Sequence, residues 1–213
     1  MTPELSVCIP VHNRSRVILP DRRVLTPLPN LVLSLYAQAK AARLSIEIVI
    51  ADFRSDDWPI RHWAAGCTVV DCDGPMSVGA GKNAAARSSR SDVLFFCDAD
   101  MLLQTADVLT RGLEAARSGR AYFPRYLRYT GPDHASTSQG NGHGCCIVTR
   151  ETWRTNPWLE STVYGVEDNA FAAAMRQLGL LVRDDPPGFY HQWHPVSEAK
   201  REAAAKRTPH GST

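Results

Sequence analysis

Several features that define common protein classes are missing from this sequence of 213 residues. The formal net charge is only +2, so the sequence lacks the basic excess expected of a dedicated nucleic-acid binder. No apolar segment approaches the ~20 residues that cross a bilayer, and no basic N-terminal region precedes a long apolar run. The six cysteines show no Cys-x-x-Cys spacing typical of zinc sites. These absences predict a soluble cytoplasmic protein with reduced thiols and no transmembrane segment.

The two common phosphate-binding loops are also missing. Gly79, Gly81 and Lys82 open an alanine-rich segment that is expected to be helical. No Gly-x-x-x-x-Gly-Lys-Ser/Thr motif is present, and Ala84 stands where the third glycine of Gly-x-Gly-x-x-Gly belongs. Amide groups at a helix start attract anions, so phosphate contact and simple helix packing are both open interpretations of these glycines.

The sequence does contain an apolar run, residues 93–97, that ends abruptly in two acids, Asp98 and Asp100. Five apolar residues rich in aromatics are typical of a strand that is covered on both faces. Residues at i and i+2 of an extended chain point the same way. The two carboxylates can therefore converge on one hard cation, or divide between a cation and a sugar hydroxyl. A solvated turn at the strand end is the alternative without function.

Two earlier strands end in the same manner. Segment 5–11 is followed by His12-Asn13-Arg14, and segment 46–51 is followed by Asp52. Ligands of parallel sheets bind at the carboxyl ends of the strands, so these side chains are candidates for ligand contact. Strands that alternate with helices predict an α/β protein with one sizeable core. Further strands are expected at 67–70, 121–124, 145–148 and 180–182, and further helices at 31–39, capped by Asn30, and at 105–117.

Two polar segments interrupt this pattern. Segment 15–30 carries three prolines and several arginines and is expected to be a surface loop. Segment 125–144 is glycine-rich and too long for a simple connector, so it is either a mobile lid or binding loop, or a disordered segment without function.

The last third of the sequence offers further titratable side chains. Glu167 and Asp168 follow Gly165 at a predicted helix start, where acids complement the helix dipole or, alternatively, face a substrate that approaches the glycine closely. His191 and His194 can supply neutral nitrogen ligands or can be structural.

The order of these motifs resembles the GT-A fold glycosyltransferases, in particular glycosyltransferase family 2 and its relatives with a galactosyltransferase-type Gly-x-Glu-Asp motif. The resemblance covers 5–195 and implies a mixed, mostly parallel sheet flanked by helices. It further implies one domain over 1–213, with a donor nucleotide-binding half at 5–103, an acceptor-binding half at 104–195 and a basic C-terminal tail at 196–213. The motifs that carry it are Pro10 with His12-Asn13-Arg14, Asp52, Gly81-Lys82-Asn83, Asp98-Ala99-Asp100, Gly142-His143-Gly144, Gly165-Val166-Glu167-Asp168 and His191 to His194.

This resemblance implies a metal-dependent inverting enzyme, a hexosyl- or N-acetylhexosaminyltransferase. The donor is a nucleoside-diphosphate sugar, with a UDP-sugar favoured, and the acceptor is the hydroxyl of a glycan, a lipid-linked or another molecule. Asp168 is the expected general base, and Glu167 orients the acceptor. The implied ligands of Mn²⁺ or Mg²⁺ are Asp98, Asp100 and His194, with His191 as second choice. The implied nucleotide contacts are Pro10, His12, Asn13, Arg14, Asp52, Phe53, Arg54, Lys82, Asp98 and Ala99.

Elementary chemistry favours the same roles. A departing diphosphate gains negative charge, which a divalent cation together with Lys82 or Arg14 would stabilise. Phe53 and Arg54 depart from the usual family motif after Asp52, and Phe53 is expected to stack on the base instead.

Three alternatives stay open on the sequence. A sugar-phosphate nucleotidyltransferase shares the nucleotide-binding half-sheet, although it should carry a glycine-rich motif near the first strand, where Val11-His12-Asn13-Arg14 has no glycine. A non-catalytic sugar-nucleotide or glycan binder of the same fold is the second. A nucleic-acid acceptor, contacted by the arginines of 15–30, is the third. The basic tail also admits peripheral contact with the inner membrane surface.

Overall fold

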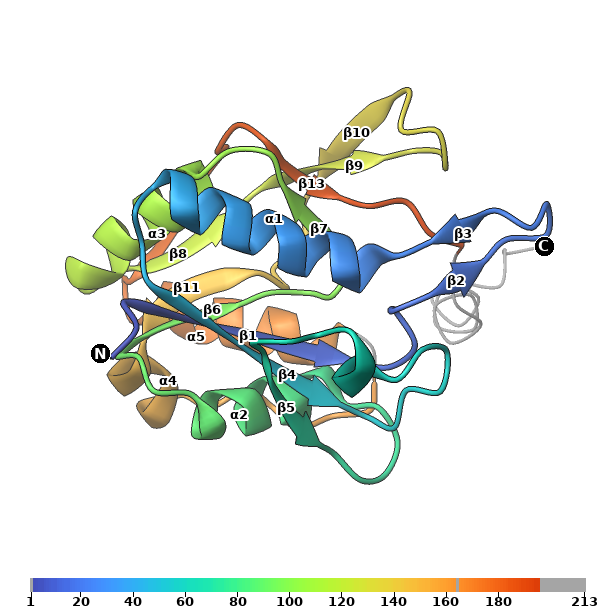
Figure 1. Cartoon of the computed structure of the whole chain (residues 1–213). Coiled ribbons are helices and arrows are strands. Elements are labelled where there is room, and N and C mark those ends of the chain that lie inside the picture. The colour runs from blue at the N-terminus through green and yellow to red at the C-terminus, as the bar shows by residue number, and fades with distance from the viewer. Residues whose placement is uncertain (1, 164, 196–213) are drawn as a thin grey trace, which may run out of the picture.

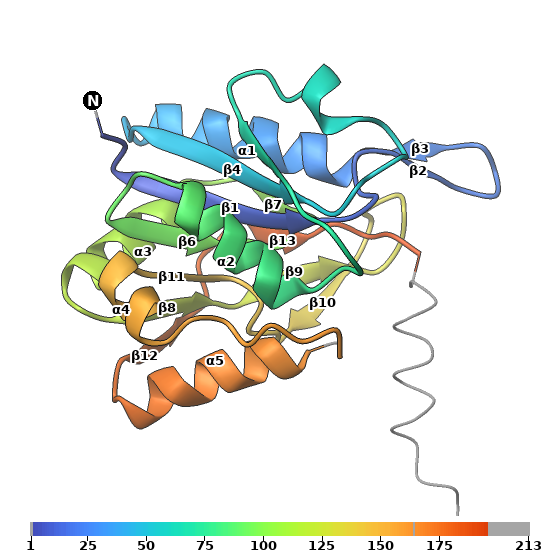
Figure 2. The same cartoon turned by 90° about the horizontal axis from the view of Figure 1, so that it is seen from below.

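The core of the protein is a sheet of seven strands between two layers of helices (Figures 1 and 2). It is seen in a computed structural model that describes residues 2–163 and 165–195. The expected basic tail, 196–213, lies outside the described residues. The order of the strands across the sheet is β12 (Leu181–Asp184), β8 (Ala121–Pro124), β11 (Cys146–Thr149), β6 (Val93–Phe96), β1 (Leu5–Val11), β4 (Ile46–Asp52) and β5 (Thr68–Asp71).

The direction of these strands agrees with the predicted fold class. β1 pairs in parallel with both β4 and β6, and β5 continues the parallel set beside β4. Only β11 runs against its neighbours, because it pairs antiparallel with both β6 and β8. The sheet is therefore mostly parallel, and the ends of β1, β4 and β6 meet at one edge.

Alternate side chains of the strands enter two separate hydrophobic clusters. Every residue of β1 is buried: Val7 and Ile9 face the layer that contains α1 (Pro27–Ala41) and α3 (Asp107–Arg117), and Cys8 faces the opposite layer. Burial on both faces is the reason that β1 and β6 read as continuous apolar runs. The opposite layer contains α2 (Val78–Ser88), α4 (Arg150–Thr155) and α5 (Val166–Gln177).

A second sheet of four strands stands beside the end of the first (Figure 1). The prediction that 125–144 is a loop without regular structure is wrong, because this segment supplies an antiparallel hairpin to that sheet. Several of its residues do line a cavity, in line with the alternative of a binding segment. Gly140 and Gly142 of this segment lie against the side chain of Tyr126, where an added Cβ would fall 2.1 Å from a ring atom and 2.8 Å from the hydroxyl, respectively. The order of this sheet is β10 (Thr137–Gly140), β9 (Tyr126–Tyr129), β13 (Phe189–His191) and β7 (Met101–Leu103).

The segment before α1 is also more ordered than expected. Residues 15–30 contain a short hairpin, β2 (Val17–Ile18) and β3 (Val24–Leu25), that extends from the body of the protein (Figure 2). The helix begins at Pro27 rather than after Asn30, since proline is favoured in the first turn. Asn30 does not cap it and instead donates a hydrogen bond to Gln192. A short 3₁₀ turn, η1 (Ile60–His62), precedes β5.

Membrane-spanning helices are not found: none of the described helices is both long enough and apolar enough to cross a bilayer.

Candidate active site

A cavity of about 900 Å³ opens where the carboxyl ends of β1 and β6 meet the second sheet and the start of α5. This volume falls in the range of about 300–1,000 Å³ that is usual for small-molecule sites. The expected site residues that line it are Pro10, His12, Asn13, Arg14, Asp98, Ala99, Asp100, Glu167, Asp168, His191 and His194.

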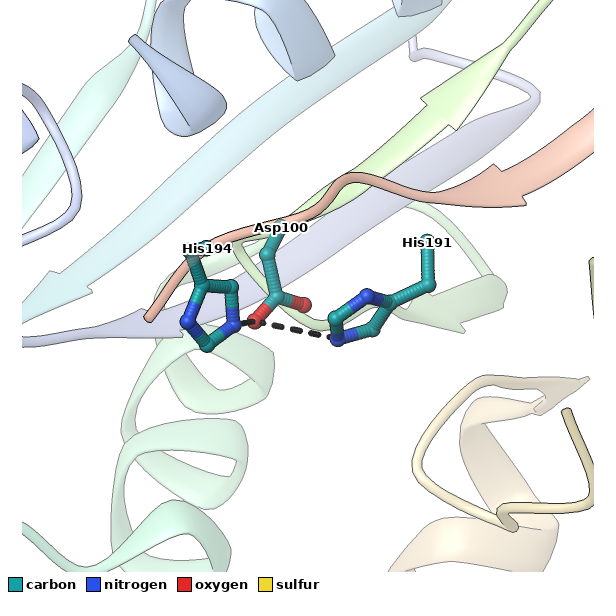
Figure 3. Close-up of side chains that lie close together, drawn as sticks. All are labelled: Asp100, His191 and His194. Carbon is teal, nitrogen blue, oxygen red and sulfur yellow. Dashed lines mark hydrogen bonds and ion pairs between the residues drawn. The ribbon is translucent and has the colours of Figure 1, made fainter. Parts of the chain in front are cut away.

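Three of these side chains form a compact cluster, which we call the triad: Asp100, His191 and His194 (Figure 3). Their ligand atoms lie within 4.8 Å of one another. Nε2 of His194 lies 2.9 Å from Oδ2 of Asp100, and Nε2 of His191 lies 3.5 Å from the same oxygen. Asp98 was expected among the metal ligands, but it is not a member of this cluster.

The pairing of β7 with β13 creates the triad. His191 lies opposite Met101, so His191 and His194 come beside Asp100, which lies more than ninety residues earlier in the chain. The backbone N–H of Gln192 donates to the carbonyl of Asp100 at 2.7 Å. The buried Gln192 side chain donates to the carbonyls of Pro27 and Met101. Gln192 therefore fixes the histidine segment against both β7 and the start of α1.

The triad fits a divalent transition-metal ion. His194 places Nδ1 2.9 Å from the carbonyl of Pro195. A carbonyl only accepts, so Nδ1 donates to it, and Nε2, which lies beside Asp100, is the nitrogen of this ring placed to bind a cation. Burial raises the pKa of Asp100, but the charges and hydrogen bonds of His191 and His194 outweigh burial and hold that pKa well below its usual range. Two imidazoles with one carboxylate suit Mn²⁺ or a later ion better than Mg²⁺, which prefers oxygen ligands.

Asp98 belongs instead to a second cluster, around a buried lysine. Nζ of Lys82 donates to Oδ1 of Asp168 at 3.0 Å and to the carbonyl of Gly144 at 2.7 Å, and it lies 3.7 Å from Oδ1 of Asp98. The ammonium group also lies 3.9 Å from the ring centroid of Trp158. Burial lowers the pKa of Lys82, but the charges of Asp168 and Asp98 outweigh burial and raise it overall. Lys82 thus holds together the carboxylates expected to serve donor and acceptor.

Of the two cations expected near the departing diphosphate, Lys82 and Arg14, only Arg14 lines the cavity. The Lys82 side chain is completely buried and donates to Gly144 and Asp168. Burial raises the pKa of Asp98 to about 6, against the effect of the Lys82 charge and together with that of Asp168.

We expect Lys82→Met to destabilise the fold by on the order of 3 kcal/mol, because it leaves two carboxylates in a half-buried site without a cation. The change in the free energy of unfolding is measured by urea denaturation. Lys40→Met, at an exposed position of α1, is the matched control. An effect of Lys82→Met no larger than that of the control would contradict a structural role for the lysine.

Only glycine fits at position 144, because the Asp98 carboxylate lies against it. A Cβ added at Gly144 would lie 2.2 Å from Oδ2 of Asp98, and the carbonyl of this residue accepts from Lys82. We therefore expect Gly144→Ala to displace the Asp98 carboxylate and to weaken binding of a sugar nucleotide while the fold persists. Calorimetric titration with the donor, beside circular dichroism of the variant, checks this. Unchanged affinity would show that Asp98 makes no contact with the ligand.

Glu167 is nearly fully buried although it lines the cavity. Burial raises its pKa, and its Oε2 has no hydrogen-bond partner among the described residues. The free Oε2 can accept a hydrogen bond from a hydroxyl of a bound ligand. This geometry suits the expected role of Glu167 in orienting an acceptor.

The glycines at the start of α2 serve close packing. A Cβ at Gly79 would lie 2.1 Å from the carbonyl oxygen of Leu159, and one at Gly81 would lie 2.7 Å from the Cβ of Pro10. Of the two interpretations left open by the sequence, the structure supports helix packing.

Besides Lys82, three further expected nucleotide contacts do not line the cavity. Phe53 is buried beside Gly81, which opposes the expectation that its ring stacks on a base. The Arg54 side chain is exposed and pairs with Asp73 at 2.5 Å. The carboxylate of Asp52 accepts from the backbone and hydroxyl of Ser55, so it stabilises the turn after β4.

Sequence reasoning missed the side chains that the second sheet brings to the cavity. Tyr126 and Arg128 alternate along β9 with the period of two that marks a strand face, and this alternation was the available signal. The overlooked cavity residues of this sheet and of the segment beyond it are Tyr126, Arg128, Tyr129, Thr130, Ser138 and Trp193.

Comparison with solved structures identifies the same fold in known proteins. The chain superimposes on S. aureus TarS residues 1–349 in complex with UDP with a TM-score of 0.62 and 15% identity, covering 94% of this chain and 63% of TarS. Glucosyl-3-phosphoglycerate synthase from Mycobacterium tuberculosis, in complex with Mn²⁺, UDP-glucose and phosphoglyceric acid, gives a TM-score of 0.65 and 16% identity over 95% of this chain and 78% of that one. These identities show likeness of fold alone.

The solved relatives are longer than this protein: the chain spans 60% of the TarS 1–349 structure without UDP. No curated protein sequence matches it. The sequence model of "Glycosyl transferase family 2" matches residues 6–165, well over half of the chain. This protein therefore belongs to glycosyl transferase family 2.

Proposed function

We propose that the protein is a metal-dependent, inverting glycosyltransferase that moves a sugar from a nucleoside-diphosphate sugar to an acceptor hydroxyl. The observation that carries the proposal is the meeting of two groups of side chains at one cavity. The triad of Asp100, His191 and His194 offers a cation site, and Asp168 offers a carboxylate base. A UDP-sugar is the favoured donor, since two solved structures of this fold are in complex with UDP or UDP-glucose.

The proposed reaction is a single displacement at the anomeric carbon. Asp168 removes the proton of the acceptor hydroxyl as its oxygen bonds to that carbon, and the bond from carbon to the diphosphate oxygen breaks with its electron pair on the diphosphate. Bound at the triad, Mn²⁺ or Mg²⁺ supplies positive charge for the leaving diphosphate. Lys82 occupies Oδ1 of Asp168, while Oδ2 accepts no hydrogen bond from the described residues and is open to the acceptor. Glu167 orients the acceptor hydroxyls.

Both expected halves of the chain contribute side chains to the proposed donor site. Residues 5–103 supply β1 and β6, whose ends bring Arg14 and Asp98 to the donor. Residues 104–195 supply Glu167 and Asp168 for the acceptor, together with the histidines of the triad.

Incubation with UDP-sugars and manganese tests this function. Release of UDP, accelerated by an acceptor, supports glycosyl transfer. Release or consumption of pyrophosphate identifies a nucleotidyltransferase instead. Tight donor binding without transfer of the sugar to any acceptor or to water, and so without release of UDP, identifies a non-catalytic binder.

A further inference from the structure

Arg128 is a cavity-lining arginine that has no ion-pair partner among the described residues. The neighbouring arginines differ from it in this respect. Arg125 is paired with Asp185, and the guanidinium of Arg183 contacts Nε2 of His143. The Arg128 side chain is exposed to the cavity and is therefore available to a ligand.

The strand register places Arg128 beside the triad. In the parallel pair of β9 and β13, Arg128 is the partner of His191, and paired strands lie about 4.8 Å apart. Tyr126, two residues earlier on the same face, stacks on the His191 ring with 6.0 Å between centroids and 24° between planes. This stacking indicates that the face of β9 that carries Tyr126 and Arg128 is turned toward the triad.

A hydroxyl group lies on the other side of Arg128. Ser138 of β10 is its partner in the antiparallel pair, and it also lines the cavity. Arg128 and Ser138 therefore offer a guanidinium fork and a hydroxyl donor next to the place where a metal would hold a diphosphate. This combination of donors suits phosphate oxygens.

The chemistry of the site requires a cation here. The cavity wall carries the carboxylates of Asp98, Asp100 and Asp168. Lys82, which was expected to offset the negative charge of a diphosphate, is paired with Asp98 and Asp168 instead. Arg14 lines the cavity from the end of β1, with its guanidinium bonded to the carbonyl of Asn13. Arg128 provides a second guanidinium, on the wall formed by the second sheet.

We propose that Arg128 is a catalytic residue that binds the diphosphate of the donor. Its guanidinium takes up the negative charge that develops on the diphosphate oxygen as the bond to the anomeric carbon breaks, and Ser138 donates a hydrogen bond to the same group. This inference rests on the proposed function, and it assigns to Arg128 the role that the sequence favoured for Lys82 or Arg14.

Titration calorimetry with UDP and UMP tests the assignment, since the two ligands differ by the β-phosphate. We expect Arg128→Gln to weaken UDP binding by about 10- to 100-fold, the worth of a charge-assisted hydrogen bond, and to leave UMP binding within a few-fold of the parent. Arg128→Lys should fall between the two, because it keeps the charge but loses the fork. Each titration is repeated in Mn²⁺ and in EDTA, so that loss of the metal is distinguished from loss of the guanidinium. Arg154→Gln, at an exposed position of α4, is the matched control.

The outcomes separate this inference from the function on which it rests. Failure of the parent protein to bind UDP in either buffer overturns the proposed donor. Binding of UDP by the parent with an unchanged ratio of UDP to UMP affinity in Arg128→Gln overturns the role of Arg128 alone. If Arg128→Gln weakens only the binding of inorganic phosphate to the UDP-saturated protein, the arginine serves an anionic acceptor, and the assignment to the donor diphosphate is likewise overturned.

Discussion

An Asp168→Asn variant is expected to turn over donor and acceptor about 10²- to 10⁴-fold more slowly than the parent protein. The amide has the shape of the carboxylate, and its oxygen can still accept the hydrogen bond from Lys82 that Oδ1 accepts at 3.0 Å. It cannot take the proton of the attacking hydroxyl. The loss should therefore appear in kcat, with the donor KM and the free energy of unfolding close to those of the parent.

The rate of UDP release with the most active acceptor measures this effect. Asp92→Asn replaces an exposed acid just before β6 and serves as the matched control. A variant that binds donor and metal normally and turns over no slower than the parent, across a panel of acceptors, would assign the base to another residue. A fall in donor affinity with unchanged kcat would place Asp168 on the donor side of the cavity.

The second large effect is expected from the triad. Removing its carboxylate in Asp100→Ala, or one imidazole in His194→Ala, should weaken manganese-dependent UDP binding by at least about 100-fold. Changes to residues that merely support a metal ligand already cost about 10- to 100-fold, and loss of a ligand itself costs more. His194→Ala should have a larger effect than His191→Ala, because the contact of Nδ1 with Pro195 preorganises His194, whereas Nδ1 of His191 has no partner among the described residues.

Calorimetric titration of UDP in Mn²⁺ and in EDTA measures these effects. Asp92→Asn and His62→Ala, both at exposed positions, are the controls for the two kinds of substitution. The parent should lose its manganese-dependent affinity for UDP in EDTA. The triad variants in Mn²⁺ should bind UDP as weakly as the parent does in EDTA. If the triad variants still bind UDP more tightly in Mn²⁺ than in EDTA, the cation binds elsewhere, and Asp98 is the first position to examine.

The sequence predicted the elements that lead to the cavity because local patterns determine them. The apolar run before Asp98 is a central strand buried on both faces, and such a strand needs no distant information to be recognised. The helix start at Gly165 is equally local, since this glycine adopts a φ of 77° directly before α5. These features brought Asp98, Asp100 and Asp168 into the expected site.

The errors concern contacts between segments far apart in the chain. Lys82 looked like a free phosphate-binding cation, and only the approach of Gly144 and α5 buries it against Asp168. Segment 125–144 looked like a loop because its glycines are read as flexible, whereas Gly140 makes room for the ring of Tyr126. The role proposed for Arg128 depends on the pairing of β9 with β13, which no local pattern reveals.

The most direct test of the account is the anomeric configuration of the first product, followed by NMR during turnover of an α-linked UDP-sugar with Mn²⁺. A single displacement with Asp168 as base and the diphosphate held at the triad predicts a β-linked product together with free UDP. An α-linked product, or release of pyrophosphate in place of UDP, would contradict it.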